Sequence, residues 1–292
     1  MTIFDLIGNT PLVELTNIPQ NNNVKIFGKL EGLNPGGSVK DRAALGMIQG
    51  ALARGDIKKG DKLVEATSGN TGIALAMIAG SMGVSMTLVM PDNATKERIL
   101  SMQAYGAEVI LTPAERTIEY SRELAESMVE NEGYHMLNQF ANPDNYLMHY
   151  NTTGPEIWEQ SDGKITHFVS AMGTTGTIMG VSRYLKEQNN KIQIVGCQPT
   201  EGSNIPGIRR WSPEFLPKIF EPERVDRIVD VSTHDATQMA RRLGKEESIL
   251  SGMSSGGAFY AAMEIAKELD SGVIVFIVCD IGDRYLSSDL FG

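Results

Sequence analysis

"KLVEATSGNTG", residues 62–72, passes from an apolar run through a turn of small polar residues into a segment with helical spacing. The run 62–66 predicts a buried strand, and the turn formers of 67–72 predict a tight turn at its carboxyl end. A helix to about residue 82 is expected to follow. A strand, a turn and a helix in this order form the repeating unit of an α/β fold.

The same order recurs along the chain. Three more apolar runs each precede an expected helix: "MTLVMP" (86–91) a helix near 95–105, "AEVILT" (107–112) one at 115–131, and "THFVSAM" (166–172) one ending near 188. "KIQIVGC" (191–197) and "VIVFIVC" (273–279) are apolar throughout, which is typical of parallel strands covered on both faces. The pattern therefore predicts an α/β protein with two domains, each a mostly parallel twisted sheet with flanking helices.

Two segments interrupt this alternation. "QFANPDNY" (139–146) is rich in turn formers and is the expected crossover between the two domains. The segment 201–224 has four prolines and no sustained periodicity. Structureless insertions of that length are usually functional, so we expect a long functional loop there.

Composition narrows the class of protein. The 292 residues are 41% hydrophobic and 21% charged, as in ordinary globular proteins. The net charge of −10, without a Lys/Arg-rich run, argues against nucleic acid and membrane surfaces as partners and favours small molecules. No signal sequence and no apolar run of ~18 residues are found, so we expect a cytoplasmic protein. Cys197 and Cys279 lie in apolar runs, which favours neither a disulfide framework nor a metal site.

A lysine occupies an unusual place in "NPGGSVKDRAA", residues 34–44. Ser38 is a good helix N-cap with Asp41 three positions later, so Lys40 is expected at the second helical position. The positive end of the helix dipole disfavours an ammonium group there, and a neutral amine is what attack on a carbonyl requires. The alternative is an ordinary exposed lysine that pairs with Asp41.

Three turns of small residues each precede an expected helix. Residues 173–177, "GTTGT", offer amides and hydroxyls that suit a phosphate, although their spacing is neither a Walker motif nor G-x-G-x-x-G. Residues 67–71, "TSGNT", suit a carboxylate, and the Asn70 amide could touch a neighbouring ring oxygen. Residues 252–257, "GMSSGG", form the third turn. Taken singly, each is explained equally well or better as an N-cap turn.

Taken together, the lysine and the three turns resemble the tryptophan-synthase-like, fold type II pyridoxal phosphate enzymes. The likeness is narrower still for "IGNTPLVEL", "NPGGSVKDRAA", "EATSGNTGIALA", "MPDNATKERI", "QFANPDN", "AMGTTGTI", "IPGIRRW" and "GDRYLSSDLF". These stretches span nearly the whole chain and resemble the O-acetylserine sulfhydrylase (cysteine synthase) family, in particular its B branch.

The resemblance implies a role for individual residues. Lys40 would hold pyridoxal 5'-phosphate as a Schiff base and remove the Cα proton, Asn70 would bond the cofactor's 3′ oxygen, and Ser254 would face the pyridine nitrogen. The cofactor phosphate would lie on Gly173, Thr174, Thr175, Gly176 and Thr177. The substrate carboxylate would be held by Thr67, Ser68, Thr71 and Gln139.

The resemblance also implies an activity and an organisation. The enzyme would be a transferase of cysteine biosynthesis that converts O-acetyl-L-serine and sulfide to L-cysteine and acetate. Residues 37–146 would form a smaller mobile substrate-binding domain, and residues 1–36 with 147–292 a larger domain that binds the cofactor phosphate. The protein would be a homodimer.

The sulfur donor and the exact reaction leave alternatives. Arg209 and Arg210, with Cys279, are expected at a polar entrance that admits thiosulfate, which would give S-sulfo-L-cysteine; solvated loop charges are the alternative. Other reactions of the family are O-phosphoserine sulfhydrylation and cystathionine β-synthase or serine dehydratase-like chemistry. A non-catalytic binding protein on the same fold is the remaining alternative.

Overall fold

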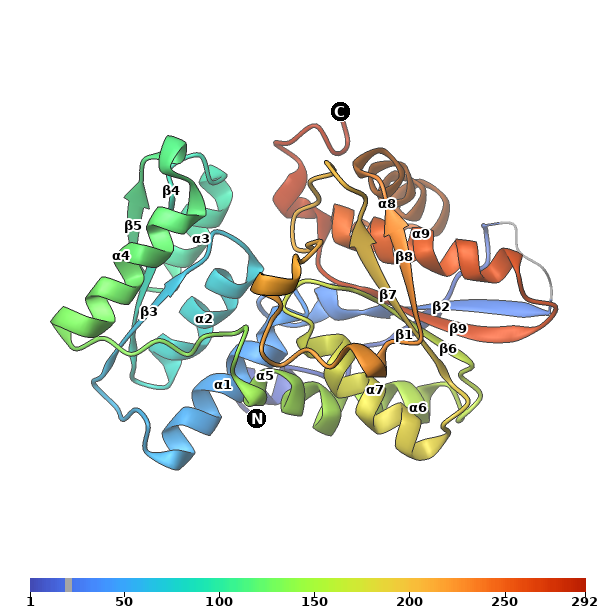
Figure 1. Ribbon diagram of the computed structural model, residues 1–292, viewed down its shortest axis with the longest axis horizontal. Helices are drawn as coiled ribbons and strands as arrows, with labels where there is room; N and C mark the ends of the chain where they lie inside the picture. The colour runs from blue at the N-terminus through green and yellow to red at the C-terminus, as the bar shows by residue number, and fades with distance from the viewer. Residues whose placement is uncertain (19–22) are drawn as a thin grey trace.

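The computed structural model describes residues 1–18 and 23–292 and contains two β-sheets that lie side by side (Figure 1). The smaller sheet has the strand order β3-β4-β5, and the larger has the order β1-β2-β9-β6-β7-β8. All neighbouring strands are parallel except β1 and β2. The α/β fold with two mostly parallel sheets is confirmed.

The smaller sheet is covered by helices on both faces. Its strands are β3 (Lys62–Ala66), β4 (Ser85–Pro91) and β5 (Glu108–Thr112). Its helices are α1 (Lys40–Arg54), α2 (Asn70–Ser81), α3 (Lys96–Ala104) and α4 (Thr117–Glu132). Leu63 and Leu88 pack in one apolar core with α1 and α2, whereas Val64 and Val89 pack against α4 on the other face. Burial on both faces explains why consecutive residues in the middle of β3 and β4, such as Leu63 with Val64 and Leu88 with Val89, are apolar.

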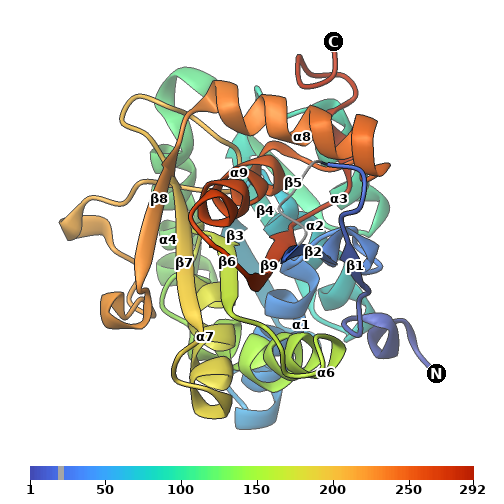
Figure 2. The same ribbon diagram turned by 90° about the vertical axis from the view of Figure 1, so that its right-hand side faces the viewer.

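The larger sheet is built in the same way. Its strands are β1 (Leu12–Glu14), β2 (Val24–Leu30), β6 (His167–Ala171), β7 (Gln193–Pro199), β8 (Arg227–Val231) and β9 (Gly272–Val278). Figure 2 shows α8 (Thr233–Glu247) and α9 (Met253–Lys267) on one face, and α6 (Gly154–Gln160) and α7 (Gly176–Gln188) on the other. The two faces carry separate apolar cores.

The connection between the sheets runs through the expected crossover. A turn at 138–142 leads into α5 (Pro143–Met148), which packs against both α1 and α7. The expected loop 201–224 carries only two short 3₁₀ turns, Pro213–Phe215 and Pro222–Arg224, which confirms its lack of regular structure. The division into domains at residues 37 and 146 stays a prediction.

The strand-to-helix turns of both sheets meet in the middle of the molecule. β3 leads into the turn 67–69 and α2, β6 leads into the turn 172–175 and α7, and β9 ends beside the start of α1. In open α/β sheets such carboxyl ends of strands are where ligands bind. No helix within residues 1–18 and 23–292 combines the length and apolar character that crossing a membrane requires. The same residues contain no cluster of His, Cys, Asp or Glu side chains suited to a metal ion.

Candidate active site

A cavity of about 790 Å³ lies between the two sheets, where these turns meet. It is lined by residues from both halves of the chain, including all but two of the sequence-predicted site residues. The sequence-predicted residues that line it are Lys40, Thr67, Ser68, Asn70, Thr71, Gln139, Gly173, Thr174, Thr177, Arg209, Arg210, Ser254 and Cys279. The exceptions are Thr175 and Gly176, which lie in the same turn as their lining neighbours.

The helix that carries Lys40 begins differently from the sequence expectation. Lys40 is the first residue of α1, Val39 is its N-cap, and the Ser38 hydroxyl accepts a hydrogen bond from the Lys40 amide at 3.2 Å. The expected capping box is wrong, because the Asp41 carboxylate accepts from the Gly36 amide, at 2.5 Å, instead of from Ser38. Asp41 is fully buried, and Lys40 forms no ion pair with any described residue. The alternative of a Lys40–Asp41 surface pair is therefore wrong as well.

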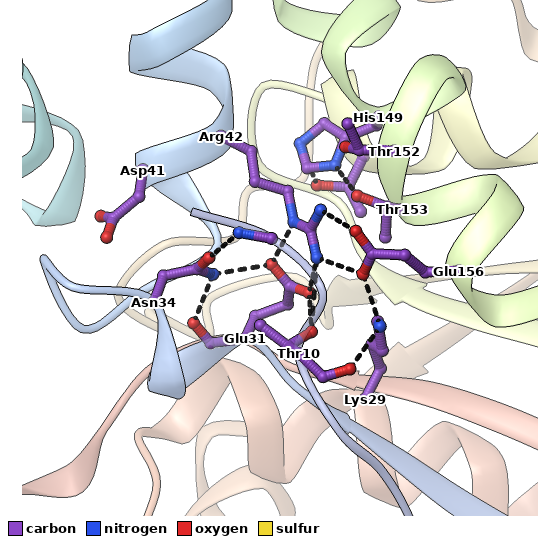
Figure 3. A network of polar contacts seen from close by, with 12 residues as sticks. Thr10, Lys29, Glu31, Asn34, Asp41, Arg42, His149, Thr152, Thr153 and Glu156 are labelled. Carbon is purple, nitrogen blue, oxygen red and sulfur yellow. Dashed lines mark hydrogen bonds and ion pairs between the residues drawn. The ribbon is translucent and has the colours of Figure 1, made fainter. Parts of the chain in front are cut away.

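A buried network of charges holds the start of α1, as Figure 3 shows. Arg42, two residues after Lys40, forms ion pairs with Glu31 at 2.8 Å and with Glu156 at 2.7 Å. Lys29 on β2 adds a third pair, with Glu156 at 2.6 Å, so that two cations face two anions. Burial raises the pKa of Glu31, but the charge and hydrogen bonds of Arg42, together with the contributions of Thr10 and Lys29, outweigh this effect and hold the pKa at about 2. The network thus ties the start of α1 to Glu31, which directly follows β2, and to Glu156 on α6.

The turn at residues 172–175 and the first residues of α7 fit a phosphate group. Thr175 has a φ of 70° and is the N-cap of α7, and its buried Oγ1 has no hydrogen-bond partner among the described residues. A Cβ atom at Gly173 would lie 2.4 Å from the Gly207 carbonyl oxygen, and one at Gly176 would lie 1.9 Å from Asn145 Oδ1. Only glycine fits at both positions. Main-chain amides at a helix start, together with an unsatisfied hydroxyl, form a donor set for an anion.

His149 lies behind this turn. Its Nε2 is 3.3 Å from Thr177 Oγ1 and its Nδ1 is 2.8 Å from Thr153 Oγ1. Burial, followed by the nearby Arg42 charge, lowers the pKa of His149 to about 3. The imidazole is therefore neutral at physiological pH, and it can accept a hydrogen bond as well as donate one. Sequence analysis did not predict this residue, which belongs to a π-helical turn between α5 and α6.

The turn at residues 67–69 and the first residues of α2 are joined to the crossover segment. Thr71 Oγ1 donates to Gln139 Oε1 at 2.9 Å, so the Gln139 amide nitrogen stays available for a ligand. Behind them, the buried Glu65 accepts a hydrogen bond from the main-chain amide of Asn138 at 2.7 Å. Asn138 has a left-handed φ of 54°, a conformation that asparagine tolerates better than most residues. Glu65 thereby places the residue that precedes Gln139.

Asn70 is oriented by the C-terminal part of the chain. Its Nδ2 donates to Asp280 Oδ2 at 2.7 Å, and its Oδ1 accepts from Arg284 Nη1 at 2.6 Å. Arg284 also donates to the carbonyl oxygen of Gly36, in the turn that precedes Lys40. One hydrogen of the Asn70 amide remains for a ligand. No local sequence signal points to Asp280 or Arg284, because both lie 210 or more positions away from Asn70.

The three residues expected at the entrance differ in their surroundings. Arg210 is committed to Asp230, at 2.9 Å, and to the Pro199 carbonyl oxygen. Arg209 has no carboxylate partner among the described residues and lies over the Trp211 ring, 5.5 Å from its centroid. Cys279 is buried at the cavity wall, and burial raises the pKa of its thiol to about 11. The thiol is therefore protonated at physiological pH and is no ready nucleophile.

The comparisons with known proteins agree with this geometry. The family described as pyridoxal-phosphate dependent enzyme matches residues 3–280, so the chain belongs to that family. Similar proteins of known activity place the chain more narrowly within this family. Cysteine synthase B of Pseudomonas aeruginosa is 58% identical over 99% of this chain and 97% of its own length, and that of Salmonella typhimurium is 55% identical over 100% and 96%. Within its family, the chain is thus a member of the cysteine synthase B group.

Solved structures give the same result. A cysteine synthase from Entamoeba histolytica superposes with a TM-score of 0.93 at 40% identity, over 99% of this chain and 90% of its own. An O-ureido-L-serine synthase superposes with the same TM-score of 0.93 at 35% identity, over 99% and 94%. By their names, both relatives are synthases of β-substituted alanines.

Proposed function

We propose that the cavity converts O-acetyl-L-serine and sulfide to L-cysteine and acetate, with pyridoxal phosphate held on Lys40. The proposal rests on one observation: Lys40, the turn suited to a phosphate and the turn suited to a carboxylate all line one cavity of about 790 Å³. The membership in the cysteine synthase B group supports the choice of substrate and product. When bound, pyridoxal phosphate withdraws electrons from the substrate Cα, which eases loss of the α-proton and of acetate.

Each group of residues then has a task. The donors of the turn at 173–177 bind the phosphate, and the neutral Ser254 hydroxyl, 5% exposed at the cavity wall, faces the pyridine nitrogen. Thr67, Ser68 and the free Gln139 amide hold the substrate carboxylate, which aligns Cα with Lys40. The Lys40 amine takes the Cα proton. A hydroxyl does not enforce protonation of the pyridine nitrogen, so Ser254 favours replacement at Cβ over transamination.

We also propose that thiosulfate is a second sulfur donor. Thiosulfate is a dianion and needs a cationic contact on its way into a confined site, whereas sulfide does not. Arg209 lines the cavity without a carboxylate partner among the described residues, and burial, followed by the neighbouring Arg122 charge, lowers its pKa. A bound dianion would relieve the repulsion between these two guanidinium groups. Arg209 is accordingly the proposed anchor, and Arg210 is a lesser one because Asp230 engages it.

The organisation of the enzyme completes the proposal. Residues 37–146 would act as the smaller mobile domain that closes on the substrate, because Thr71 and Gln139 lie on it and line the same cavity as the phosphate-binding turn. Residues 1–36 with 147–292 would form the larger domain. A homodimer in the cytoplasm remains the expected assembly and location.

The test is cysteine formation by the purified protein loaded with pyridoxal phosphate. The wild type is expected to form cysteine and acetate in equal amounts from O-acetyl-L-serine and sulfide. Lys40→Ala is expected to keep its fold but to lose turnover. Among the described residues, no other amine lines the cavity and could replace Lys40. Unchanged turnover in Lys40→Ala would refute the mechanism. Pyruvate as the main wild-type product would indicate the elimination reaction instead.

A further inference from the structure

One side-chain amide joins the two ligand-binding turns. Asn145 lies on α5 and is 2% exposed. Its Nδ2 donates to the main-chain carbonyl oxygen of Gln139 at 2.7 Å and to the side-chain hydroxyl oxygen of Thr174 at 3.1 Å. Gln139 belongs to the proposed carboxylate site, and Thr174 to the proposed phosphate site. Asn145 touches both without lining the cavity itself.

These contacts determine what the Thr174 hydroxyl can do. Its oxygen accepts from Asn145 Nδ2 and, at 3.4 Å, from the main-chain amide of Gly176. A hydroxyl accepts at two lone pairs and donates one hydrogen. With both lone pairs taken, Thr174 is left as a donor, and it faces the cavity.

The packing around Asn145 leaves little freedom to rearrange. A Cβ atom at Gly176 would lie 1.9 Å from Asn145 Oδ1, so the turn can rest on the asparagine only because residue 176 is glycine. Burial also means that a lost hydrogen bond is not replaced by solvent, which makes the loss costly.

We propose that Asn145 is a positioning residue that turns the Thr174 hydroxyl into a donor to the cofactor phosphate and fixes its distance from Gln139. The inference rests on the proposed function, because it takes the turn at 173–177 as the phosphate site. It extends that function by adding a residue that acts on both ligands through their binding turns.

Two substitutions at the same position separate this role from simple space filling. Asn145→Ala removes the donor, whereas Asn145→Asp keeps the shape but replaces the donor by an acceptor. The aspartate would draw the Thr174 hydrogen toward itself and place a negative charge beside the phosphate. We therefore expect pyridoxal phosphate affinity to fall roughly tenfold in Asn145→Ala and further in Asn145→Asp. A space-filling role predicts the opposite order.

The chain offers a matched control. Asn142 is the N-cap of α5 and donates to a main-chain carbonyl oxygen in the same way, at 2.9 Å from Leu137 O, but no hydrogen bond joins its side chain to the phosphate-binding turn. Asn142→Ala is expected to change stability without changing cofactor affinity. Thr174→Val, which removes the hydroxyl and keeps the shape, should lower the affinity about as much as Asn145→Ala. The double variant should lose little more than either single variant, because both remove one interaction.

The experiment measures pyridoxal phosphate affinity and the ³¹P NMR shift of the bound phosphate in the holoenzyme, with circular dichroism as the check on folding. The inference is supported if Asn145→Asp binds the cofactor more weakly than Asn145→Ala and if both variants and Thr174→Val move the ³¹P shift. It is overturned if Asn145→Asp binds as the wild type does, or if Thr174→Val leaves the shift unchanged; the second result decides even if the Asn145 variants do not fold. A wild type that loads the cofactor but makes no cysteine would contradict the proposed function and leave this comparison valid.

Discussion

Arg42 and Glu31 form a bidentate ion pair, with Arg42 Nε 2.8 Å from Glu31 Oε2 and Arg42 Nη2 2.8 Å from Glu31 Oε1. Both side chains are fully buried, and the pair lies directly behind the start of the helix that presents Lys40. A charge removed from such a pair leaves its partner buried and uncompensated. The pair therefore matters for the position of Lys40 as well as for stability.

Glu31→Gln is expected to lower the free energy of unfolding by about 3–5 kcal/mol, because Arg42 loses its main counter-charge. Urea unfolding followed by circular dichroism measures the change. Glu14→Gln serves as the control, because Glu14 pairs with Lys25 at an exposed site and should matter little. If the two substitutions lowered the free energy of unfolding equally, the buried Arg42 network would contribute no more to stability than an exposed ion pair.

Glu65 gives a prediction about pH. Burial raises the pKa of Glu65 from its ordinary value of 4.5 to about 7. The folded protein thus holds this proton more tightly than the unfolded chain, and stability falls as the pH rises between these two values. Glu65→Gln removes that dependence. As the pH rises between these two values, the free energy of unfolding of the variant should therefore increase relative to that of the wild type, by at most about 3 kcal/mol at the upper value.

Urea unfolding of both proteins at several pH values measures this difference. The pKa of Asp41 is also raised by burial, to about 7, and Asp41 acts in the same direction; it is present in both proteins and cancels in the comparison. A stability difference that stays constant with pH would mean that Glu65 is not protonated in the folded state near neutral pH.

The two turns should be separable by substitution. Gln139→Leu is expected to raise the KM for O-acetyl-L-serine roughly tenfold or more and to leave pyridoxal phosphate affinity nearly unchanged, because it removes a carboxylate donor. Thr175→Val should do the reverse, because its buried hydroxyl is unsatisfied until a phosphate is bound. Steady-state kinetics and cofactor titration measure both quantities. If both variants raised the KM for O-acetyl-L-serine and lowered pyridoxal phosphate affinity to the same extent, the turns would be assigned to the wrong ligands.

We expect the choice of sulfur donor to depend on Arg209. Arg209→Ala should raise the KM for thiosulfate roughly tenfold and leave the KM for sulfide unchanged. Arg210→Ala is the matched control and should have a smaller effect, because Asp230 already engages that guanidinium group. The measurement is product formation with each donor at saturating O-acetyl-L-serine. If Arg209→Ala impairs both donors equally, Arg209 is no specific anchor.

Local signals in the sequence were enough for much of the fold and the site. The strand at 62–66 and the turns at 67–71 and 173–177 could be predicted because their apolar runs, glycines and caps are contiguous in the chain. β2 was not predicted, because its two lysines do not suggest a buried parallel strand. Lys29 is nevertheless fully buried, since Glu156 neutralises it from a helix that lies far along the chain.

The supporting residues of the site could not be predicted for a related reason. Asn145, Asp280 and Arg284 act through contacts that depend on how the two sheets meet, and no spacing in the sequence encodes those contacts. The helix start shows the same limit on a small scale. Asp41 three positions after Ser38 suggested a capping box, but the carboxylate turns back to Gly36 instead.

Covalent mapping can identify the residue that holds the cofactor, which we propose is Lys40. Borohydride reduction of the protein loaded with pyridoxal phosphate fixes the cofactor to the amine that carries it, and mass spectrometry of the digested chain then locates the label. We expect a single labelled peptide that contains Lys40, and no label in Lys40→Ala. A label on another lysine, or an unmodified Lys40 in a protein that still forms cysteine, would contradict it.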